Sequence, residues 1–301
     1  MRGEAWRRVT VSVCLPERLP NRKEEATPQA SAFGWLDMVS NICHRPAGPR
    51  SFDGIGVHAA EGVHEAALSL LGRHLRAGLR VADLGAGSGA FSVRLRAAGY
   101  EPMAVDMNVD VRPDGITFLE ADITDLGALF EEASLPAAVA IESMEHLRDP
   151  MGFVESVLHV LEPGGLFLAT TPNVTHPYSR LKFVAKGTYW LFDPELYERT
   201  GHTTPLPEWL LRAHLTHAGF QDIEYGLVGN FDFRGIKRMI TKAMRGPLRL
   251  AGAPLGVEGD GSNLIILARK SDGARRAASS CARRAWPSLS GCDGSAARCA
   301  E

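Results

Sequence analysis

Hydrophobic positions in the middle of the chain change between two periods, which predicts helices and strands in turn. Residues 58–76 have the helical period, with one apolar face made of Val63, Ala67, Leu70, Leu71 and Leu75. Gly78 is expected to end this helix before a short buried strand at 80–84. Further strands are predicted at 102–106, 116–120, 137–141 and 166–170, and helices at 89–98, 126–133, 150–161 and 207–218.

Strands that alternate with helices in this way are typical of βαβ units, which build a parallel sheet. Two further strand-like runs, 220–228 and 262–269, have no crossover helix of the usual spacing between them and predict an antiparallel pair. The expected fold class is therefore α/β, with a Rossmann-like seven-stranded sheet that is mostly parallel and has an antiparallel C-terminal strand pair.

Both ends of the chain differ from the middle in composition. Residues 1–50 lack sustained periodicity, and residues 271–301 are mostly Ala, Ser, Arg, Gly and Cys, so neither end is expected to bury much apolar surface. We expect a weakly structured extension at 1–50, one domain at 51–270 and a low-complexity tail at 271–301.

Charge and composition narrow the class of protein. The 301 residues include 33 lysines and arginines against 35 aspartates and glutamates, which excludes a generally basic nucleic-acid-binding protein. No apolar run approaches the ~18 residues of a membrane-spanning helix, and the N-terminus lacks the apolar segment of a secretory signal. The 5 cysteines include no CxxC pair, so a reducing, cytoplasmic location is expected.

A glycine-rich turn follows the first predicted strand of the sheet. Gly85, Gly87 and Gly89 lie between this strand and a helix, where backbone can approach a ligand closely. Asp106 ends the next strand, where a carboxylate can accept hydrogen bonds from both hydroxyls of a ribose. The pattern predicts a nucleoside cofactor. Because Ala90 also satisfies the dinucleotide spacing, the glycines alone leave a nicotinamide cofactor open.

Five motifs then follow in order, VADLGAGSG, AVDMN, EADITD, IESMEHLRDP and LEPGGLFLATTPN. In this order and spacing they resemble the motifs of class I S-adenosylmethionine-dependent methyltransferases, over about residues 55–270. The terminal strand pair also resembles that family's sheet rather than a dehydrogenase's. The resemblance implies that the glycines line the methionine part of S-adenosylmethionine. It further implies cofactor contacts from Asp83 to the amino group, from Asp106 to the ribose and from Asp122 and Ile123 to the adenine, with Met107 and Glu142 completing the set. The alternative for Asp122 is an N-cap or turn residue.

A second group of polar residues follows the strand at 137–141. Glu142, Glu145 and His146 form an E-x-x-E-H set that projects on one side if the segment is helical. With His202 as a candidate fourth ligand, this set suits Mg, Mn, Fe or Zn. The arrangement resembles small-RNA 3′-terminal 2′-O-methyltransferases and ubiquinone-pathway O-methyltransferases, which implies an ion that binds adjacent hydroxyl oxygens of the acceptor.

Two alternatives to the ion remain open. In one, His146 is a general base for a hydroxyl or an amine. In the other, Glu145 bonds backbone amides and His202 caps the helix at 207–218. In either catalytic reading, His146 and Glu145 are the expected catalytic residues.

The segment 171–205 is expected to be a lid over the acceptor. Its candidate substrate contacts are polar and aromatic residues, Asn173, His176, Tyr178, Arg180, Tyr189 and Trp190. The alternative is a small satellite core under the lid. A basic insert at 231–260 contains an amphipathic stretch at 234–250, which predicts peripheral contact with an anionic membrane or, alternatively, a helix packed on the domain.

The function predicted from these residues is methylation of a small-molecule or glycan hydroxyl by S-adenosylmethionine, with no nucleic acid as partner. Three alternatives stay open: a metal-free methyltransferase that also accepts amines, a nicotinamide-dependent oxidoreductase, and a cofactor-binding subunit without catalysis.

Overall fold

The computed structural model describes residues 51–108, 112–229, 243 and 261–272. The expected N-terminal extension, nearly all of the basic insert with its stretch at 234–250, and the tail from residue 273 lie outside the described residues.

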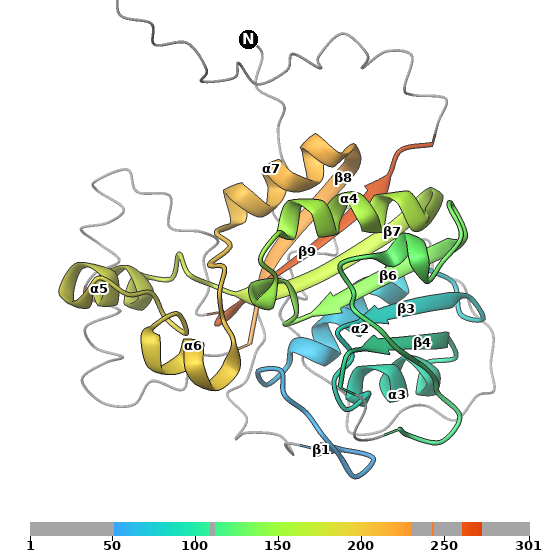
Figure 1. Cartoon of the computed structure of the whole chain (residues 1–301), viewed down its shortest axis with the longest axis horizontal. Helices are drawn as coiled ribbons and strands as arrows, with labels where there is room; N and C mark the ends of the chain where they lie inside the picture. The colour runs from blue at the N-terminus through green and yellow to red at the C-terminus, as the bar shows by residue number, and fades with distance from the viewer. Residues whose placement is uncertain (1–50, 109–111, 230–242, 244–260, 273–301) are drawn as a thin grey trace, which may run out of the picture.

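A seven-stranded sheet forms the centre of the domain (Figure 1). Its order is β5-β4-β3-β6-β7-β9-β8. The bounds are β3 Arg80–Leu84, β4 Glu101–Asp106, β5 Thr117–Glu120, β6 Leu135–Ile141, β7 Leu161–Pro172, β8 Phe220–Val228 and β9 Asn263–Lys270. The pairs between β3, β4, β5, β6 and β7 are parallel, and β9 is antiparallel to both β7 and β8. The predicted mostly parallel sheet with an antiparallel C-terminal pair is therefore confirmed.

Helices cover both faces of this sheet (Figure 1). On one face lie α2 Val63–His74 and α3 Ala90–Ala97, whose apolar side chains form one core cluster with β3, β6, β7 and β9. On the other face lie α4 Pro150–Val160 and α7 Glu208–Ala218, in a second cluster that includes Phe153 and Phe167. Both faces are buried, which explains why the central strands are nearly continuous apolar runs without alternation.

Two helices that the sequence pattern did not predict lie beyond the carboxyl end of β7 (Figure 1). These are α5 Pro177–Lys186 and α6 Pro194–Thr200. Each has proline in its first turn, a side-chain N-cap from His176 or Asp193, and a left-handed glycine at its C-cap. These boundary signals are present in the sequence. Both helices bury few apolar residues, so the apolar period that predicted the other helices is weak in them.

Two predicted helices have different bounds in the structure. The helix expected at 126–133 is only a 3-10 turn, η1 Leu126–Ala128, because Gly127 lowers helix propensity and Ala133 has a φ of 53°. The helix expected from residue 58 begins at Val63, because Gly62 at its N-cap has a φ of 81°. A short hairpin, β1 Ser51–Phe52 and β2 Ile55–Gly56, precedes α2.

Among the described residues, the helices are too short or too polar to cross a membrane.

Candidate active site

A cavity of about 930 Å³ opens at the carboxyl ends of β3, β4 and β6. In parallel sheets this edge collects ligands, because the loops that follow the strands meet there. The cavity wall includes eight of the nine predicted cofactor residues, Asp83, Gly85, Gly87, Asp106, Met107, Asp122, Ile123 and Glu142. His146 also lines it. The predicted cofactor residues therefore come together around one space.

The glycine turn is shaped by contacts that a side chain would disturb. Gly85 has a φ of 76°, and a Cβ built there would lie 2.5 Å from the Ser143 hydroxyl. Gly87 has a φ of 53° and donates its amide to Asp106 Oδ2 at 2.8 Å. Gly89, the one predicted cofactor residue outside the cavity wall, is the left-handed N-cap of α3 and packs against Phe118. It therefore starts the helix, and its contact with the cofactor stays a prediction.

Asp83 is a buried carboxylate at the base of the cavity. It is 1% exposed, and Ser92 donates a hydrogen bond to its Oδ2 at 2.6 Å. Burial raises the pKa of Asp83 to about 6, the Ser92 hydrogen bond lowers it, and the charge of Asp106 raises it further. A cationic ligand group beside Asp83 would stabilise its charged form.

Asp106 and Asp122 each organise a turn and face the cavity. Asp106 Oδ1 accepts the amide of Asn108 at 2.9 Å, and Asp122 Oδ1 accepts the amide of Thr124 at 2.8 Å. Asp122 is therefore a turn residue, as one reading of the sequence proposed, and it also lines the cavity. A carboxylate oxygen has two lone pairs, so both residues retain acceptor capacity for hydroxyl or amine donors.

Glu142 does not take the position that the E-x-x-E-H pattern predicted. It has a φ of 53° and precedes the 3-10 turn η2 Met144–His146, so the expected helical alignment with Glu145 and His146 is wrong. Its carboxylate instead accepts hydrogen bonds from Thr170 Oγ1 at 2.7 Å and from Asn263 Nδ2. Burial raises the pKa of Glu142 to about 7, and these two hydrogen bonds lower it. Glu142 thus links β6 to β7 and β9, and we remove it from the predicted ion ligands.

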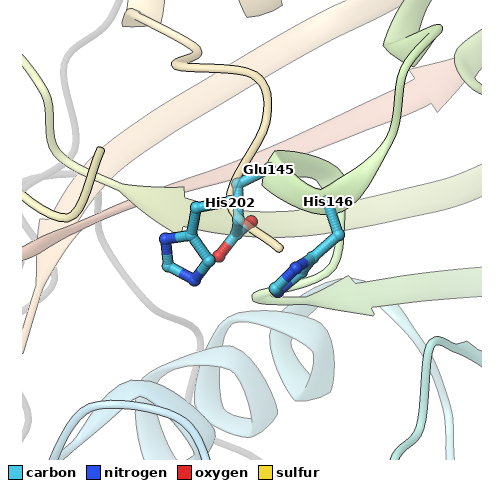
Figure 2. A group of neighbouring side chains, drawn as sticks. All are labelled: Glu145, His146 and His202. Atoms are coloured by element: carbon cyan, nitrogen blue, oxygen red, sulfur yellow. The ribbon is translucent and has the colours of Figure 1, made fainter. Parts of the chain in front are cut away.

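The other three predicted ion ligands do come together. One ligand atom from each of Glu145, His146 and His202 lies within 4.8 Å of the others, and Figure 2 shows the three side chains turned toward one another. Glu145 is 1% exposed, and its Oε2 has no hydrogen-bond partner among the described residues. The Thr171 hydroxyl lies close enough to lower the pKa of this carboxyl but forms no hydrogen bond of normal geometry with it.

Backbone hydrogen bonds hold His202 beside the 3-10 turn although 56 residues separate it from His146. The amides of Thr203 and Thr204 donate to the Glu145 carbonyl at 2.9 and 3.0 Å. His202 Nδ1 lies 3.0 Å from the carbonyl oxygen of Leu191. If Nδ1 carries the proton and donates to this carbonyl, the lone pair of Nε2 is available to an ion, as in many histidine metal ligands. His202 therefore does not cap α7, whose N-cap is Pro207.

The charges of this group are set mainly by burial. Burial raises the pKa of Glu145 well above its usual range, and the nearby Glu142 carboxylate raises it further. Burial lowers the pKa of His146, while the backbone carbonyls of Gly201 and Thr200, as hydrogen-bond acceptors for the ring, raise it. Burial, followed by the neighbouring His146, lowers the pKa of His202. The two imidazoles are therefore neutral at pH 7, the state in which histidine binds metal ions.

The predicted substrate residues have mixed positions. Asn173 and His176 are buried and shape the loop after β7, because Asn173 bonds to Gly261 and Thr175, and His176 caps α5. Tyr178 and Trp190 pack edge to face at 5.6 Å, and Arg180 donates to the Thr175 carbonyl at 2.8 Å. These contacts resemble the satellite core that was the alternative interpretation. For Asn173 and His176 the structure favours that alternative over acceptor contacts.

Tyr189 differs from the other predicted substrate residues because it lines a second, smaller pocket of about 250 Å³. Phe192, Tyr197 and His202 also line it. Since His146 lines the large cavity and His202 the small pocket, the three-ligand group lies between the two spaces.

Several residues of the site were not predicted. Thr170 and Asn263 come from strands that the sequence placed correctly, but nothing in a single sequence pairs them with Glu142. Thr203 and Thr204 hold the His202 loop through contacts across the fold. His64 lines the cavity as well; the sequence leaves two positions open for it, the border of the cofactor cleft and an ordinary helix face, and favours the second.

Comparisons with known proteins identify the family of this chain. A family model described as a methyltransferase domain matches residues 57–225. The ubiquinone biosynthesis O-methyltransferase of Methylocella silvestris is 34% identical over 107 residues, which cover 33% of this chain and 41% of that protein. The demethylmenaquinone methyltransferase of Clavibacter sepedonicus is 32% identical over 98 residues, which cover 30% of this chain and 39% of that protein. The chain thus matches about two fifths of the length of these curated relatives.

Among solved structures, a SAM-dependent methyltransferase from Archaeoglobus fulgidus aligns with a TM-score of 0.49 and 18% identity, covering 69% of this chain and 94% of that one. The family model covers more than half of the chain and includes every strand from β3 to β7. By this family-model match, and as the motifs implied, the chain belongs to the methyltransferase domain family.

Proposed function

We propose that this protein transfers a methyl group from S-adenosylmethionine to a hydroxyl of a small-molecule or glycan acceptor, with a divalent ion held by Glu145, His146 and His202. The observation that carries the proposal is the three-ligand group beside the cofactor cavity, in which a buried carboxylate oxygen has no hydrogen-bond partner among the described residues. A buried polar atom without a partner costs free energy, and a cation would satisfy it.

The cavity suits S-adenosylmethionine in the charge and the type of its lining groups. Asp83 places a buried carboxylate where the family motif implies the amino group of methionine, and a bound ammonium would offset the cost of burying that charge. Asp106 and Asp122 retain acceptor capacity for the ribose hydroxyls and the adenine amine. Ile123, which is 9% exposed, offers an apolar surface for the ring. S-adenosylmethionine supplies a methyl group on a sulfonium, which needs alignment more than activation.

The ligand set suits a divalent ion. Two neutral imidazoles and one carboxylate are ligands that Zn, Fe or Mn accept, and a set of three protein ligands leaves positions for acceptor oxygens. A bound ion would supply Lewis-acid chemistry, lowering the pKa of a neighbouring hydroxyl. The chain's own residues fix the geometry: the Thr203 and Thr204 amides hold His202 beside the 3-10 turn, and His146 faces the cavity.

The name of one reported relative supports oxygen as the methylated atom. The Methylocella silvestris protein is named an O-methyltransferase of ubiquinone biosynthesis. Because the match covers only 41% of that protein, its acceptor is not transferred to this chain. The proposal is therefore limited to a hydroxyl, with small molecules and glycans as the acceptor classes to screen.

His146 as a general base is the second candidate mechanism. It lines the cavity, and burial lowers its pKa, so the neutral imidazole can accept a proton from a hydroxyl or an amine without an ion. This mechanism makes Glu145 and His202 supports of His146 rather than ligands, and it brings amine acceptors back into the screen.

Ligand-dependent melting temperatures distinguish these mechanisms before any acceptor is known. S-adenosylhomocysteine, the demethylated cofactor, is expected to stabilise the wild type by about 3 kcal/mol at a concentration of about 100 times Kd, a shift of roughly 5–10 °C. Mn²⁺ is expected to add a second shift that EDTA reverses. His202→Ala should lose the Mn²⁺ shift and keep the cofactor shift. The matched control His217→Ala changes an exposed histidine of α7 and should keep both.

The outcomes separate the candidates. A Mn²⁺ shift that persists in His202→Ala would place the ion elsewhere. No Mn²⁺ shift, with a normal cofactor shift, would favour His146 as the base. Transfer of labelled methyl to pools of catechols, sugars and amines then distinguishes an enzyme from a cofactor-binding subunit. A cytoplasmic location and the membrane contact through 234–250 stay predictions.

A further inference from the structure

His64 is a buried histidine at the cavity wall for which the proposed function has no role. It is the second residue of α2, it is 6% exposed, and it lines the cavity with Asp83 and Glu142. Its Nδ1 is buried and has no hydrogen-bond partner among the described residues. Burial lowers the pKa of His64 to about 3, and the charge of Arg94 lowers it further, so the ring is neutral.

The position of His64 is at the methionine end of the cavity. Its ring packs edge to face on Phe91, with the centroids 5.1 Å apart. Phe91 also lines the cavity, and the next residue, Ser92, holds Asp83 through a hydrogen bond of 2.6 Å. Because Asp83 marks the expected place of the methionine amino group, His64 lies at the same end as the methionine carboxylate.

The environment of the ring selects one tautomer. A buried N–H without a partner is rarer in proteins than an acceptor without one, so the proton is favoured on Nε2 and the lone pair on Nδ1. Only Nδ1 is both fully buried and unpartnered, which leaves Nε2 as the nitrogen with access to the cavity. The ring therefore offers one N–H donor to a ligand.

The rest of the cavity wall is rich in acceptors, and its side-chain donors Asn108 and Thr124 follow Asp106 and Asp122 rather than Asp83, while His58 lies near Gly56. Carboxylates outnumber cations, because the lining residues include Asp83, Asp106, Asp122, Glu142 and Asp149 but only Arg148 as a guanidinium. The hydroxyls of Ser88 and Ser143 already donate to the carbonyls of Gly56 and Ile141. Arg94 is the cation whose charge affects the pKa of His64. Its guanidinium pairs with Glu65 at 2.6 Å and lies over the Phe52 ring.

An amino-acid ligand needs a donor for its carboxylate in such an acidic cavity. Without one, the carboxylate would lose hydrogen bonds to water and meet like charges. We propose that His64 binds the carboxylate of the methionine part of the cofactor by donating from Nε2. This assignment rests on the proposed function, and it makes His64 a specificity residue for ligands that carry an amino-acid end.

Calorimetric binding of two ligands tests the assignment without an acceptor. One ligand is S-adenosylhomocysteine, and the other is its decarboxylated analogue, which keeps the adenosine, the sulfur and the amine. His64→Leu, which preserves volume but removes the donor, should weaken S-adenosylhomocysteine roughly 10- to 100-fold, the range expected for a lost hydrogen bond to a charged group. The analogue should change by less than about 2-fold, because it has no carboxylate to lose.

Two variants control for folding and for shape. His64→Gln keeps an amide donor and should recover part of the affinity. His74→Leu changes a histidine of the same helix that pairs with Glu224 outside the cavity wall, and it should leave both affinities unchanged. Far-UV circular dichroism of each variant checks the fold.

An equal loss for both ligands in His64→Leu, or no loss for either, overturns the assignment. If the wild type binds neither ligand, the proposed function fails, and the assignment fails with it. A selective loss for the carboxylate-bearing ligand supports both.

Discussion

Gly85 and Gly87 lie in the same turn and have left-handed backbones, yet an alanine would meet very different surroundings at each position. A Cβ at Gly85 would lie 2.5 Å from Ser143 Oγ and 2.8 Å from Ser143 Cβ. A Cβ at Gly87 would meet no described atom within 4 Å. Rotation of the Ser143 side chain can move Oγ but not Cβ, so the clash at Gly85 cannot be relieved by a change of rotamer.

The free energies of unfolding should differ accordingly. A left-handed backbone costs a residue with a side chain roughly 1–2 kcal/mol, and the lower entropy of unfolded alanine offsets about 0.4–1 kcal/mol. Gly87→Ala should therefore cost about 0–1.6 kcal/mol. Gly85→Ala carries the same backbone cost plus an overlap of about 1–3 kcal/mol with a buried side chain. We expect Gly85→Ala to melt roughly 2–12 °C below Gly87→Ala.

The assay is thermal unfolding of both variants without ligand, together with the double variant Gly85→Ala/Ser143→Gly. Removing the Ser143 side chain takes away both close atoms, so the double variant should recover most of the difference, with an interaction energy of about 1–3 kcal/mol. Equal melting temperatures for the two alanine variants would refute the reasoning. So would a double variant in which the two losses simply add.

Three further predictions concern stability. Asp83→Asn should stabilise the ligand-free protein by about 2–3 kcal/mol at pH 7. The pKa of Asp83 in the folded protein is about 6, above its ordinary value of 3.8, so ionisation of Asp83 destabilises the fold as the pH rises from 4 to 6. Urea unfolding should show the gain at pH 7.5 and little gain at pH 4, and an equal gain at both would contradict it. Thr170→Val removes a hydrogen-bond donor to Glu142 and should cost about 1–3 kcal/mol, whereas Thr171→Val should cost less because that buried hydroxyl has no partner of normal geometry. Asp149→Ala should lower the free energy of unfolding by about 1 kcal/mol in the same assay, because it removes the N-cap hydrogen bond from the Gly152 amide. Asp149→Asn should restore that stability, and no loss in the alanine variant would mean that the cap does not stabilise α4.

The fold was predictable where local pattern and burial agree. Strands such as Arg80–Leu84 are buried on both faces and read as apolar runs, and α4 begins with Asp149 and Pro150 in the cap and first helical positions. The prediction of a helix at 126–133 was wrong because the apolar residues of this segment lie in a 3-10 turn and a loop. They still pack in the core cluster with α4, so their spacing resembles that of a buried helix face. Helices α5 and α6 have clear caps but bury few apolar side chains. A prediction based on the spacing of apolar residues therefore misses them.

The cofactor side of the site was predictable because its residues directly follow strands. Strand register carries Asp83, Asp106 and Glu142 to one edge of the sheet, whatever the loops do. The position of Glu142 relative to Glu145 was not predictable, since it depends on one backbone angle of 53°. The partners of His202 lie in a turn far away in sequence, and only the folded chain brings the Thr203 and Thr204 amides to the Glu145 carbonyl.

The ligand-free site combines groups that each cost stability. Asp83 and Glu145 are almost fully buried carboxylates whose pKa values are raised by burial, and Glu145 has one oxygen without a partner among the described residues. A neutral side chain would cost less free energy than a buried carboxylate at either position. A bound cation would offset this cost and so stabilise the folded state. The ammonium of the cofactor would relieve it at Asp83, and a divalent ion would relieve it at Glu145. Asp83→Asn should therefore gain stability in the ligand-free protein and lose affinity for the cofactor, because the same carboxylate that destabilises the fold would bind the ammonium of the cofactor.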